Sequence, residues 1–258
     1  LQQAGYVTNF TDAACLLPRH VRPDETQFDL EVRARSYLAV NCGYCHQPGS
    51  GSAPASWDGR PAVRLADTRL INGVASSAGT DPSNRLVVPG DLVHSIIFNR
   101  VAVSNGFTRM PPLGSSELDL VNIQLLADWI TLQLPGRQDY AAWRLDRFGS
   151  TNSLAGEPGG DPDEDNRSNL EEFLTYTDPQ QSDPARFTTL GGTGDQVNVG
   201  LALPGRLVQV EASTNLADWF SWLVPGNDGL PLATGSVRQL HGPAPGPEGF
   251  FRFQVVEP

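Results

Sequence analysis

The sequence predicts a multidomain protein in which an all-α domain is followed by a small all-β, sandwich-like C-terminal module. Residues 30–134 carry apolar residues at three- and four-residue spacing and almost no strand pattern. After Pro184 the chain consists of short alternating or β-rich runs, divided by turn-forming residues. We therefore expect four units, which are an N-terminal arm (1–27), the all-α domain (28–136), a linker (137–185) and the β module (186–258).

Four helices are expected. The first begins at Leu30 and runs into Cys42, and the second lies around residues 92–101. The third is predicted to begin with Ser116 as its N-cap and Asp119 three residues later, and Pro135-Gly136 should end it. A short fourth helix is predicted from Tyr140. The expected apolar stripe of the third helix consists of Leu118, Val121, Leu125, Trp129 and Leu132.

Four segments of the β module are predicted to form strands, namely RLVQVEAS, WFSWLV, SVRQLH and GFFRFQVV. In the last of these, alternation predicts that Phe251, Phe253 and Val255 face one way. Arg252 and Gln254 should then face the other way, because successive side chains of a strand point to opposite faces.

The charge pattern excludes some classes of partner. The net charge is −11 and every basic residue is Arg, so nucleic acid and anionic membranes are poor partners. No apolar run approaches the roughly 18 residues that a membrane-spanning helix needs, so no transmembrane segment is expected. The chain begins at Leu1 without Met, and we expect it to be a processed or excised piece of a longer protein.

The segment Cys42-Gly43-Tyr44-Cys45-His46 has the spacing C-x-x-C-H. Zinc would need four ligands, and the chain has no second Cys pair. A redox dithiol of the thioredoxin type would follow a strand, whereas a helix is predicted here. A chance occurrence and covalent attachment of haem c remain, and C-x-x-C-H is the attachment pattern for c-type haem.

A haem iron held by His46 needs a sixth ligand or an open face. The chain has one methionine, Met110, in the loop RMPPLGSS just before the third predicted helix. A thioether ligand raises the reduction potential, as suits an electron carrier. The alternative is that Met110 fills a gap in the core.

A helix ending in C-x-x-C-H, a loop Met followed by two prolines and a closing helix with LLADWI resemble a class I c-type (monohaem) cytochrome, over about Phe28 to Leu134. EVRARSYLAVNCGYCHQPGS and VVPGDLVHSIIFNRV resemble more specifically the cytochrome modules attached to secreted bacterial proteins. The resemblance implies that Cys42 and Cys45 are thioether anchors, that His46 is the proximal iron ligand and that Met110 is the distal one.

Other residues are assigned around this haem. Trp57, Arg85 and Arg100 are candidates for bonding its propionates, since Arg suits carboxylates. His94 is the alternative distal ligand, although a lone His on a helix face is more often structural. His20 and His241 lie outside the predicted cytochrome domain and are expected to be structural. Cys15 is the odd thiol, and we expect it to be buried rather than bridged to another chain.

The acidic stretch from Asp161 to Glu172 has the spacing of an EF-hand calcium loop. Position 6, where Gly is expected, is Asn166, and Asn tolerates the left-handed conformation better than most residues. GDPDEDNRSNLEEFLTYTDP also resembles the single-loop calcium repeats of bacterial extracellular proteins, with Asp178 or Asp183 as an added ligand. A solvated acidic linker is the alternative. The predicted ligands are Asp161, Asp163, Asp165, the Arg167 backbone carbonyl, Asn169 and Glu172.

These features favour an electron-transfer protein of the bacterial periplasm or exterior, with one covalent haem c, a calcium ion and a redox partner protein. Neither a G-x-G-x-x-G motif nor a plausible hydrolytic triad is present, so we expect no enzyme activity of the chain itself. The first alternative is an electron-accepting domain processed from a larger secreted dehydrogenase-type enzyme. The second is a binding or adhesion protein led by the β module. A homo-oligomer, open and head-to-tail, would form a filament that carries electrons.

Overall fold

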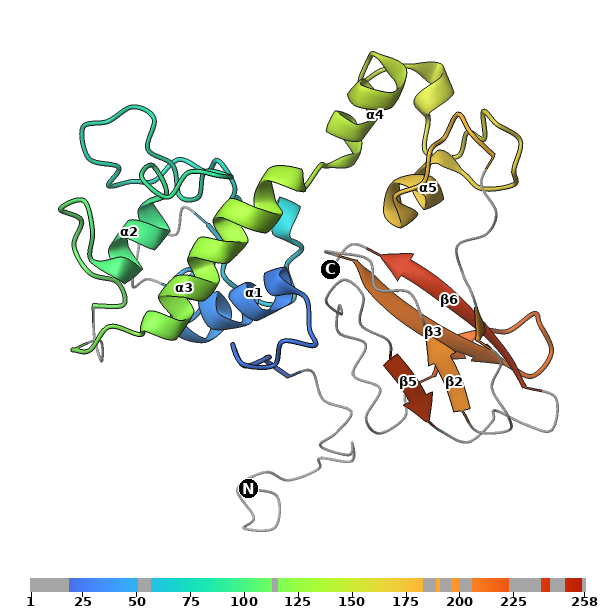
Figure 1. Ribbon diagram of the computed structural model, residues 1–258, viewed down its shortest axis with the longest axis horizontal. Coiled ribbons are helices and arrows are strands. Elements are labelled where there is room, and N and C mark those ends of the chain that lie inside the picture. Colours follow the sequence, from blue (N-terminus) through green and yellow to red (C-terminus); the bar gives the residue numbers. More distant parts are fainter. Residues whose placement is uncertain are drawn as a thin grey trace, which may run out of the picture.

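The computed structural model describes residues 19–50, 57–112, 116–182, 189–190, 196–199, 206–222, 238–241 and 249–256. Within these ranges the chain forms a helical part first and two small antiparallel sheets last (Figure 1). The predicted order of helices followed by strands is therefore confirmed. None of the described helices is both long enough and apolar enough to cross a bilayer.

Helix α1 (Leu30–Asn41) begins and ends as the sequence predicts. The Asp29 side chain accepts a hydrogen bond from the Glu31 backbone N–H at 2.8 Å and so caps the first turn. The helix ends at Cys42, where the C-x-x-C-H segment begins. Val21, from the end of the predicted arm, is buried, and its N–H donates to the Ser36 hydroxyl of α1. The last residues of the arm therefore pack against this helix.

Helix α2 (Ile96–Ala102) follows the Pro-Gly turn and covers only the second half of the predicted segment. Helix α3 (Leu120–Asp128) begins three residues later than predicted. Its N-cap is Asp119, which accepts from the Asn122 N–H at 3.1 Å, so the expected capping role of Ser116 is wrong. A π-helical turn (Trp129–Gln133) and a 3₁₀ turn (Leu134–Gly136) continue the helix to the predicted stop.

The predicted apolar stripe of α3 is also corrected. Val121 and Leu132 are exposed and Leu118 is largely exposed, whereas the buried side chains of this segment are Leu125, Leu126, Trp129, Ile130 and Leu134. The wide π turn adds a residue to one turn and rotates the later positions relative to a regular α-helix. Leu132, inside the π turn, therefore leaves the buried face, whereas Leu125 and Trp129 are buried as predicted. Leu118 and Val121 lie before the π turn, ahead of the helix and in its first turn.

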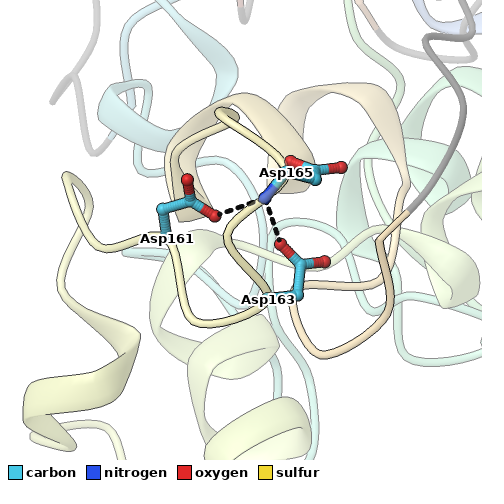
Figure 2. Close-up of side chains that lie close together, drawn as sticks. All are labelled: Asp161, Asp163 and Asp165. Atoms are coloured by element: carbon cyan, nitrogen blue, oxygen red, sulfur yellow. Dashed lines mark hydrogen bonds between the residues drawn. The ribbon is translucent and has the colours of Figure 1, made fainter.

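Helix α4 (Tyr140–Phe148) has the predicted start and ends at the left-handed Gly149, and a 3₁₀ turn follows (Leu154–Gly156). Helix α5 (Asn169–Thr175) was not expected within the linker. Ser168 and Glu171 form a capping box at its start, which is the sequence signal that would have indicated it. The loop before α5 brings three aspartates together, as Figure 2 shows.

The strands form two three-stranded antiparallel sheets with the orders β1-β2-β5 and β4-β3-β6. The predicted segments contain β3 (Leu207–Ser213), β4 (Phe220–Ser221), β5 (Arg238–His241) and β6 (Phe250–Val256). In β6, Arg252 and Gln254 are exposed and Phe251 is half-buried, as the alternation predicts. The strands β1 (Thr189–Leu190) and β2 (Gln196–Val199) were not predicted.

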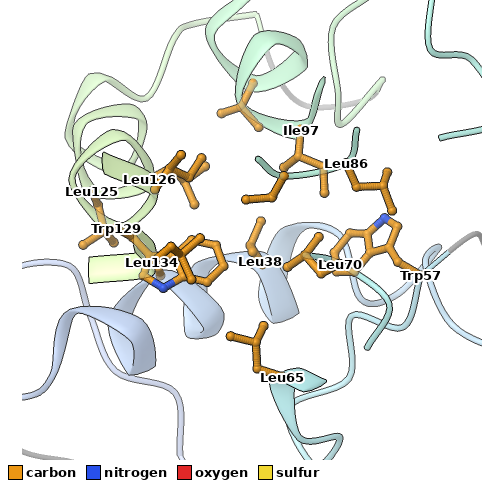
Figure 3. Packing of buried hydrophobic residues seen from close by; sticks show 14 residues of the cluster. Leu38, Trp57, Leu65, Leu70, Leu86, Ile97, Leu125, Leu126, Trp129 and Leu134 are labelled. Carbon is orange, nitrogen blue, oxygen red and sulfur yellow. The ribbon is translucent and has the colours of Figure 1, made fainter. Parts of the chain in front are cut away.

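The core of the helical part is built from α1, α2, α3 and the loops between them. Its side chains pack in one cluster, and in Figure 3 Leu38 of α1 lies between Trp129 on one side and Leu70 and Trp57 on the other. Burial of such side chains is the main favourable contribution to folding. The cluster consists of Ala34, Leu38, Trp57, Leu65, Leu70, Leu86, Val87, Ile97, Val101, Leu125, Leu126, Trp129, Ile130 and Leu134.

Candidate functional site: a cavity at the C-x-x-C-H segment and an acidic loop

A cavity opens beside the C-x-x-C-H segment. Its walls include Cys42, His46, Trp57, Arg100 and Met110, which come from separate parts of the sequence. The rest of the wall is mostly apolar and consists of Ala75, Ser76, Ser77 and Leu86 together with Ile96, Ile97 and Val101 of α2. The cavity volume is about 150 Å³, which is smaller than the roughly 300–1,000 Å³ of typical cofactor sites. The structure thus brings together five of the seven predicted haem-site residues.

The C-x-x-C-H segment continues the last turn of α1. The N–H groups of Cys45 and His46 both donate to the Cys42 carbonyl, at 3.1 and 2.8 Å. The Gly59 N–H donates to the His46 carbonyl at 2.7 Å and ties the segment to the loop at 57–59. A Cβ on Gly43 would lie 2.7 Å from the Ala39 carbonyl oxygen and 2.9 Å from that of Gly59. Sequence reasoning missed both glycines, because only their contact in space reveals their role.

The two cysteines are free thiols in this structure, and both are half-buried. Cys42 lines the cavity, whereas Cys45 does not. Desolvation, with a smaller contribution from nearby Cys45, raises the pKa of Cys42 to about 12. Cys42 is therefore an uncharged thiol rather than a low-pKa redox cysteine.

His46 stacks on the indole of Trp57, with ring centroids 5.0 Å apart and planes 21° apart. Its Nδ1 atom is buried and has no hydrogen-bond partner in the described part of the chain. Burial, together with the nearby charge of Arg100, lowers the pKa of His46 below its usual value. The imidazole is therefore neutral at physiological pH, which is the form that binds metals.

Arg100 connects Met110 to the opposite wall of the cavity. The backbone N–H of Met110 donates to the Arg100 carbonyl at 3.2 Å. The guanidinium of Arg100 donates to the carbonyls of Thr108 at 3.0 Å and Ser77 at 3.3 Å. The guanidinium carbon also lies 5.5 Å from the ring centroid of Phe107, within the roughly 6 Å reach of a cation–π contact. Arg100 thus holds the Met-bearing loop through its backbone carbonyl at Met110 and through its side chain at Thr108.

Arg85 and His94 do not line the cavity. The Arg85 guanidinium donates to two carbonyls of its own turn, Pro82 and Asn84, both at 2.7 Å. The His94 ring faces carboxylates on both sides, with Nδ1 2.5 Å from Asp91 and Nε2 3.5 Å from Asp81. Neither residue is placed for the role in haem binding that the sequence suggested.

Of the remaining histidines, His20 does not line the cavity. His20 is exposed near the start of the described chain. His241 is the last residue of β5. Cys15, whose burial was predicted, lies outside the described residues, as does Asp183.

The acidic loop folds around its own carboxylates. One oxygen from each of Asp161, Asp163 and Asp165 lies within 4.8 Å of the others. The Asp165 N–H donates to oxygens of Asp161 and Asp163, both at 3.2 Å (Figure 2). Asn166 has φ +70°, the left-handed conformation expected of position 6. Its N–H also donates to Asp161, at 3.0 Å.

Glu172, at position 12 of the loop, lies in α5 and is completely buried. Neither of its carboxylate oxygens has a hydrogen-bond partner among the described residues. Burial raises the pKa of Glu172 to about 7, with further contributions from the charges of Asp163 and Asp165. A buried carboxylate with unsatisfied oxygens is costly unless it binds a cation.

The remaining predicted calcium ligands are Asn169, Arg167 and Asp178. Asn169 is fully buried and donates to the carbonyls of Ala155 and Glu157, and its own Oδ1 has no partner in the part of the chain that the structure describes. The side chain of Arg167 forms an ion pair with Asp165 at 2.5 Å, so it neutralises part of the cluster. Asp178 is directed elsewhere, since it pairs with Arg147 at 3.5 Å.

Comparison of the chain with family models, with curated proteins and with solved structures finds no match.

Proposed function

We propose that residues 28–136 form a class I c-type cytochrome domain with one covalently attached haem, and that the chain acts in electron transfer. The observation that carries this proposal is the cavity itself. Cys42 and His46 lie on one wall and Met110, from a distant loop, lies on the same cavity. The spacing C-x-x-C-H is the attachment pattern of c-type haem. Cys42 and Cys45 form no disulfide, and the described chain contains no further cysteine beside them.

The side chains of the cavity suit a c-type haem. Cys42 and Cys45 would form the thioethers, and neutral His46 would offer a ring nitrogen to iron. Met110 would offer its sulfur from the loop that Arg100 holds. Arg100 and the indole of Trp57, which both line the cavity, would be available to the propionates. When bound, the haem supplies one-electron exchange between Fe(II) and Fe(III).

The apolar side chains of the cavity wall would influence the reduction potential by shielding the haem from water. Leu86, Ile96, Ile97 and Val101 keep water from the space that the macrocycle would fill. Low polarity and a thioether ligand both favour the reduced, less charged state of a haem iron. We therefore propose an electron carrier with a raised potential, exchanging electrons with a redox partner protein.

Covalent attachment is tested by mass spectrometry of the chain produced with a c-type haem maturation system. The wild-type mass should rise by one haem and should keep that increment after unfolding. A Cys42→Ser, Cys45→Ser double variant should gain no covalent haem, and Cys15→Ser is the matched thiol control. A wild-type chain without added mass would refute the proposal.

We also propose that the loop from Asp161 to Glu172 binds one calcium ion as a structural site. The observation that favours it is the buried Glu172 carboxylate, whose oxygens have no hydrogen-bond partner within the described ranges, beside three clustered aspartates. Oxygen donors alone are what calcium prefers. Calorimetry should show one binding site in wild-type protein and a much weaker one in Glu172→Gln. Chelation should lower the melting temperature of the 140–258 part, and an unchanged melting curve would favour a plain acidic linker.

The wider setting is proposed on the same basis. Thioether haem and an all-oxygen calcium site suit the periplasm or the exterior of a bacterium. The alternative is an electron-accepting domain of a larger secreted dehydrogenase-type enzyme. Copies joined head-to-tail would instead form a conducting filament. Sizing and electron microscopy of native material distinguish these, since a filament requires haems within tunnelling distance in neighbouring copies.

A further inference from the structure

Helix α5 carries two neighbouring residues with different surroundings. Glu172 is the fully buried carboxylate of the proposed calcium site. Phe173 is 3% exposed and packs against two rings of α4, with centroid distances of 5.3 Å to Tyr140 and 5.7 Å to Trp143. Adjacent residues of a helix point about 100° apart, so one short helix connects the acidic loop to an aromatic cluster.

The same end of α5 holds a residue from the β part. Arg206, directly before β3, is 2% exposed. Its guanidinium carbon lies 4.6 Å from the ring centroid of Phe173 and 5.0 Å from that of Tyr176. Tyr176 is the C-cap of α5. A cation enclosed by two rings and shielded from water is a strong and orientation-dependent contact. Helix α5 also contacts β6.

Calcium binding by Asp161, Asp163, Asp165 and Glu172 together would require the Glu172 carboxylate to move toward the aspartates. Its oxygens are not part of the group that lies within 4.8 Å of one another at the aspartates. A calcium ion bound in the EF-hand manner takes both oxygens of the position-12 carboxylate. Helix α5 would then be fixed at its Glu172 side, and Phe173 and Tyr176 would be fixed with it.

We propose that calcium in the loop 161–172 strengthens the attachment of the sheet β4-β3-β6 to α5. The attachment is made by the cation–π contacts of Arg206 with Phe173 and Tyr176. This inference rests on the proposed calcium site. The site would thus act on the β part of the chain as well as on its own loop. Without calcium, the carboxylates repel one another and α5 holds Arg206 less firmly.

The test is hydrogen exchange of the full chain with calcium and with a chelator, alongside calorimetry with calcium alone. In wild-type protein, calcium should slow the exchange of amides in β3 and β6 several-fold. In Arg206→Met, which keeps an apolar stem but no charge, calcium should still bind, with an affinity lower by no more than the factor of slowing seen in wild type, and should no longer slow these amides. Slowing within α5 should persist in that variant.

Arg252→Met is the matched control. Arg252 lies over the ring of Trp219 at 4.4 Å and pairs with Glu211 in the same sheet, four residues along the β3–β6 register from the pair Leu207–Val256 next to Arg206. It should keep the full calcium response of β3 and β6. Glu172→Gln provides a second variant that leaves Arg206 in place, and it should lose the response at calcium concentrations that saturate wild type.

Two results would overturn the inference while leaving the calcium site intact. In the first, calorimetry shows binding but exchange in β3 and β6 is the same with and without calcium. In the second, Arg206→Met responds like wild type. Absence of calcium binding in the wild-type calorimetry would refute the site itself, and the inference with it.

Discussion

The imidazole of His46 lies against the indole of Trp57, with ring centroids 5.0 Å apart. Trp57 is 4% exposed and belongs to the core cluster, so a core residue supports the proposed iron ligand directly. This contact joins the stability of the helical part to the orientation of His46. It also gives Trp57 a role other than the propionate contact that the sequence suggested.

Trp57→Ala should therefore affect both properties. Removing a buried aromatic ring typically costs about 3–5 kcal/mol of unfolding free energy, and His46 should lose its fixed ring orientation. Denaturant unfolding measures the first effect, and the ring resonances of His46 in NMR spectra measure the second. Trp57→Phe keeps an aromatic surface and should retain sharp His46 resonances. Equal ring mobility in Ala and Phe variants would argue against the stacking role.

Gly43→Ala should destabilise the C-x-x-C-H segment, because the added Cβ would meet backbone atoms of Ala39 and Gly59. Overpacking of this kind typically costs about 1–3 kcal/mol. Gly136→Ala is the control, since a Cβ there meets nothing within 4 Å. Its effect should stay within about 0.5 kcal/mol. Equal unfolding free energies for the two variants would show that the close approach to Gly59 is not required.

Arg137→Ala should be strongly destabilising. Arg137 pairs with Glu31 at 3.1 Å, and the Glu31 side chain is only 2% exposed. Loss of Arg137 leaves the buried Glu31 carboxylate with the nearby charge of Arg35, and the cost should approach the roughly 3–5 kcal/mol typical of breaking a buried pair. The pair of half-exposed Arg60 with Asp58 is the comparison, and Arg60→Ala should be much less destabilising. Chemical unfolding of both variants provides the measurement.

The cluster around His94 should make stability depend on pH. A hydrogen bond to Asp91, and the charges of Asp91 and Asp81, raise the pKa of His94 above its usual value. The folded state therefore holds the proton more tightly than the unfolded state does. This contribution is complete below a pH of about 6.5 and is lost as the pH rises through the folded-state pKa.

His94→Gln should remove this dependence, and Asp91→Asn should reduce it. Melting temperatures recorded from acidic to alkaline pH measure it. The wild type should lose stability relative to His94→Gln as the pH rises above about 6.5. A constant difference between the two across the whole range would contradict the expected protonation of His94.

Some helices and strands could be predicted from the sequence and others could not, and the difference has physical causes. Helices α1 and α4 were both predicted, α1 from Leu30 into Cys42 and α4 from Tyr140. The observed helices end at the C-x-x-C-H segment and at Gly149. Helix α3 has a local stop too, but its start and buried face depend on Asp119 and on a π turn that no regular spacing reveals. Strands β1 and β2 are short and gain their identity from pairing, which local sequence does not record.

The candidate sites show the same division. His46 and Met110 could be matched by residue type, and the structure places both on one cavity. Arg85 could not be judged in this way, because its side chain is held by carbonyls of its own turn. The left-handed conformation of Asn166 follows the loop pattern. The burial of Glu172 depends on how α5 packs, and sequence spacing carries no information on that packing.

The most direct test of the central claim compares the visible spectra of haem-loaded wild type and Met110→Ala. We predict that oxidised wild type shows the weak long-wavelength band of methionine-to-iron coordination. Met110→Ala should lose that band, keep the mass of one attached haem, and have a lower reduction potential. His94→Gln should resemble wild type in all three measurements. A band that survives in Met110→Ala, or that disappears in His94→Gln, would contradict the assignment of His46 and Met110 as the iron ligands.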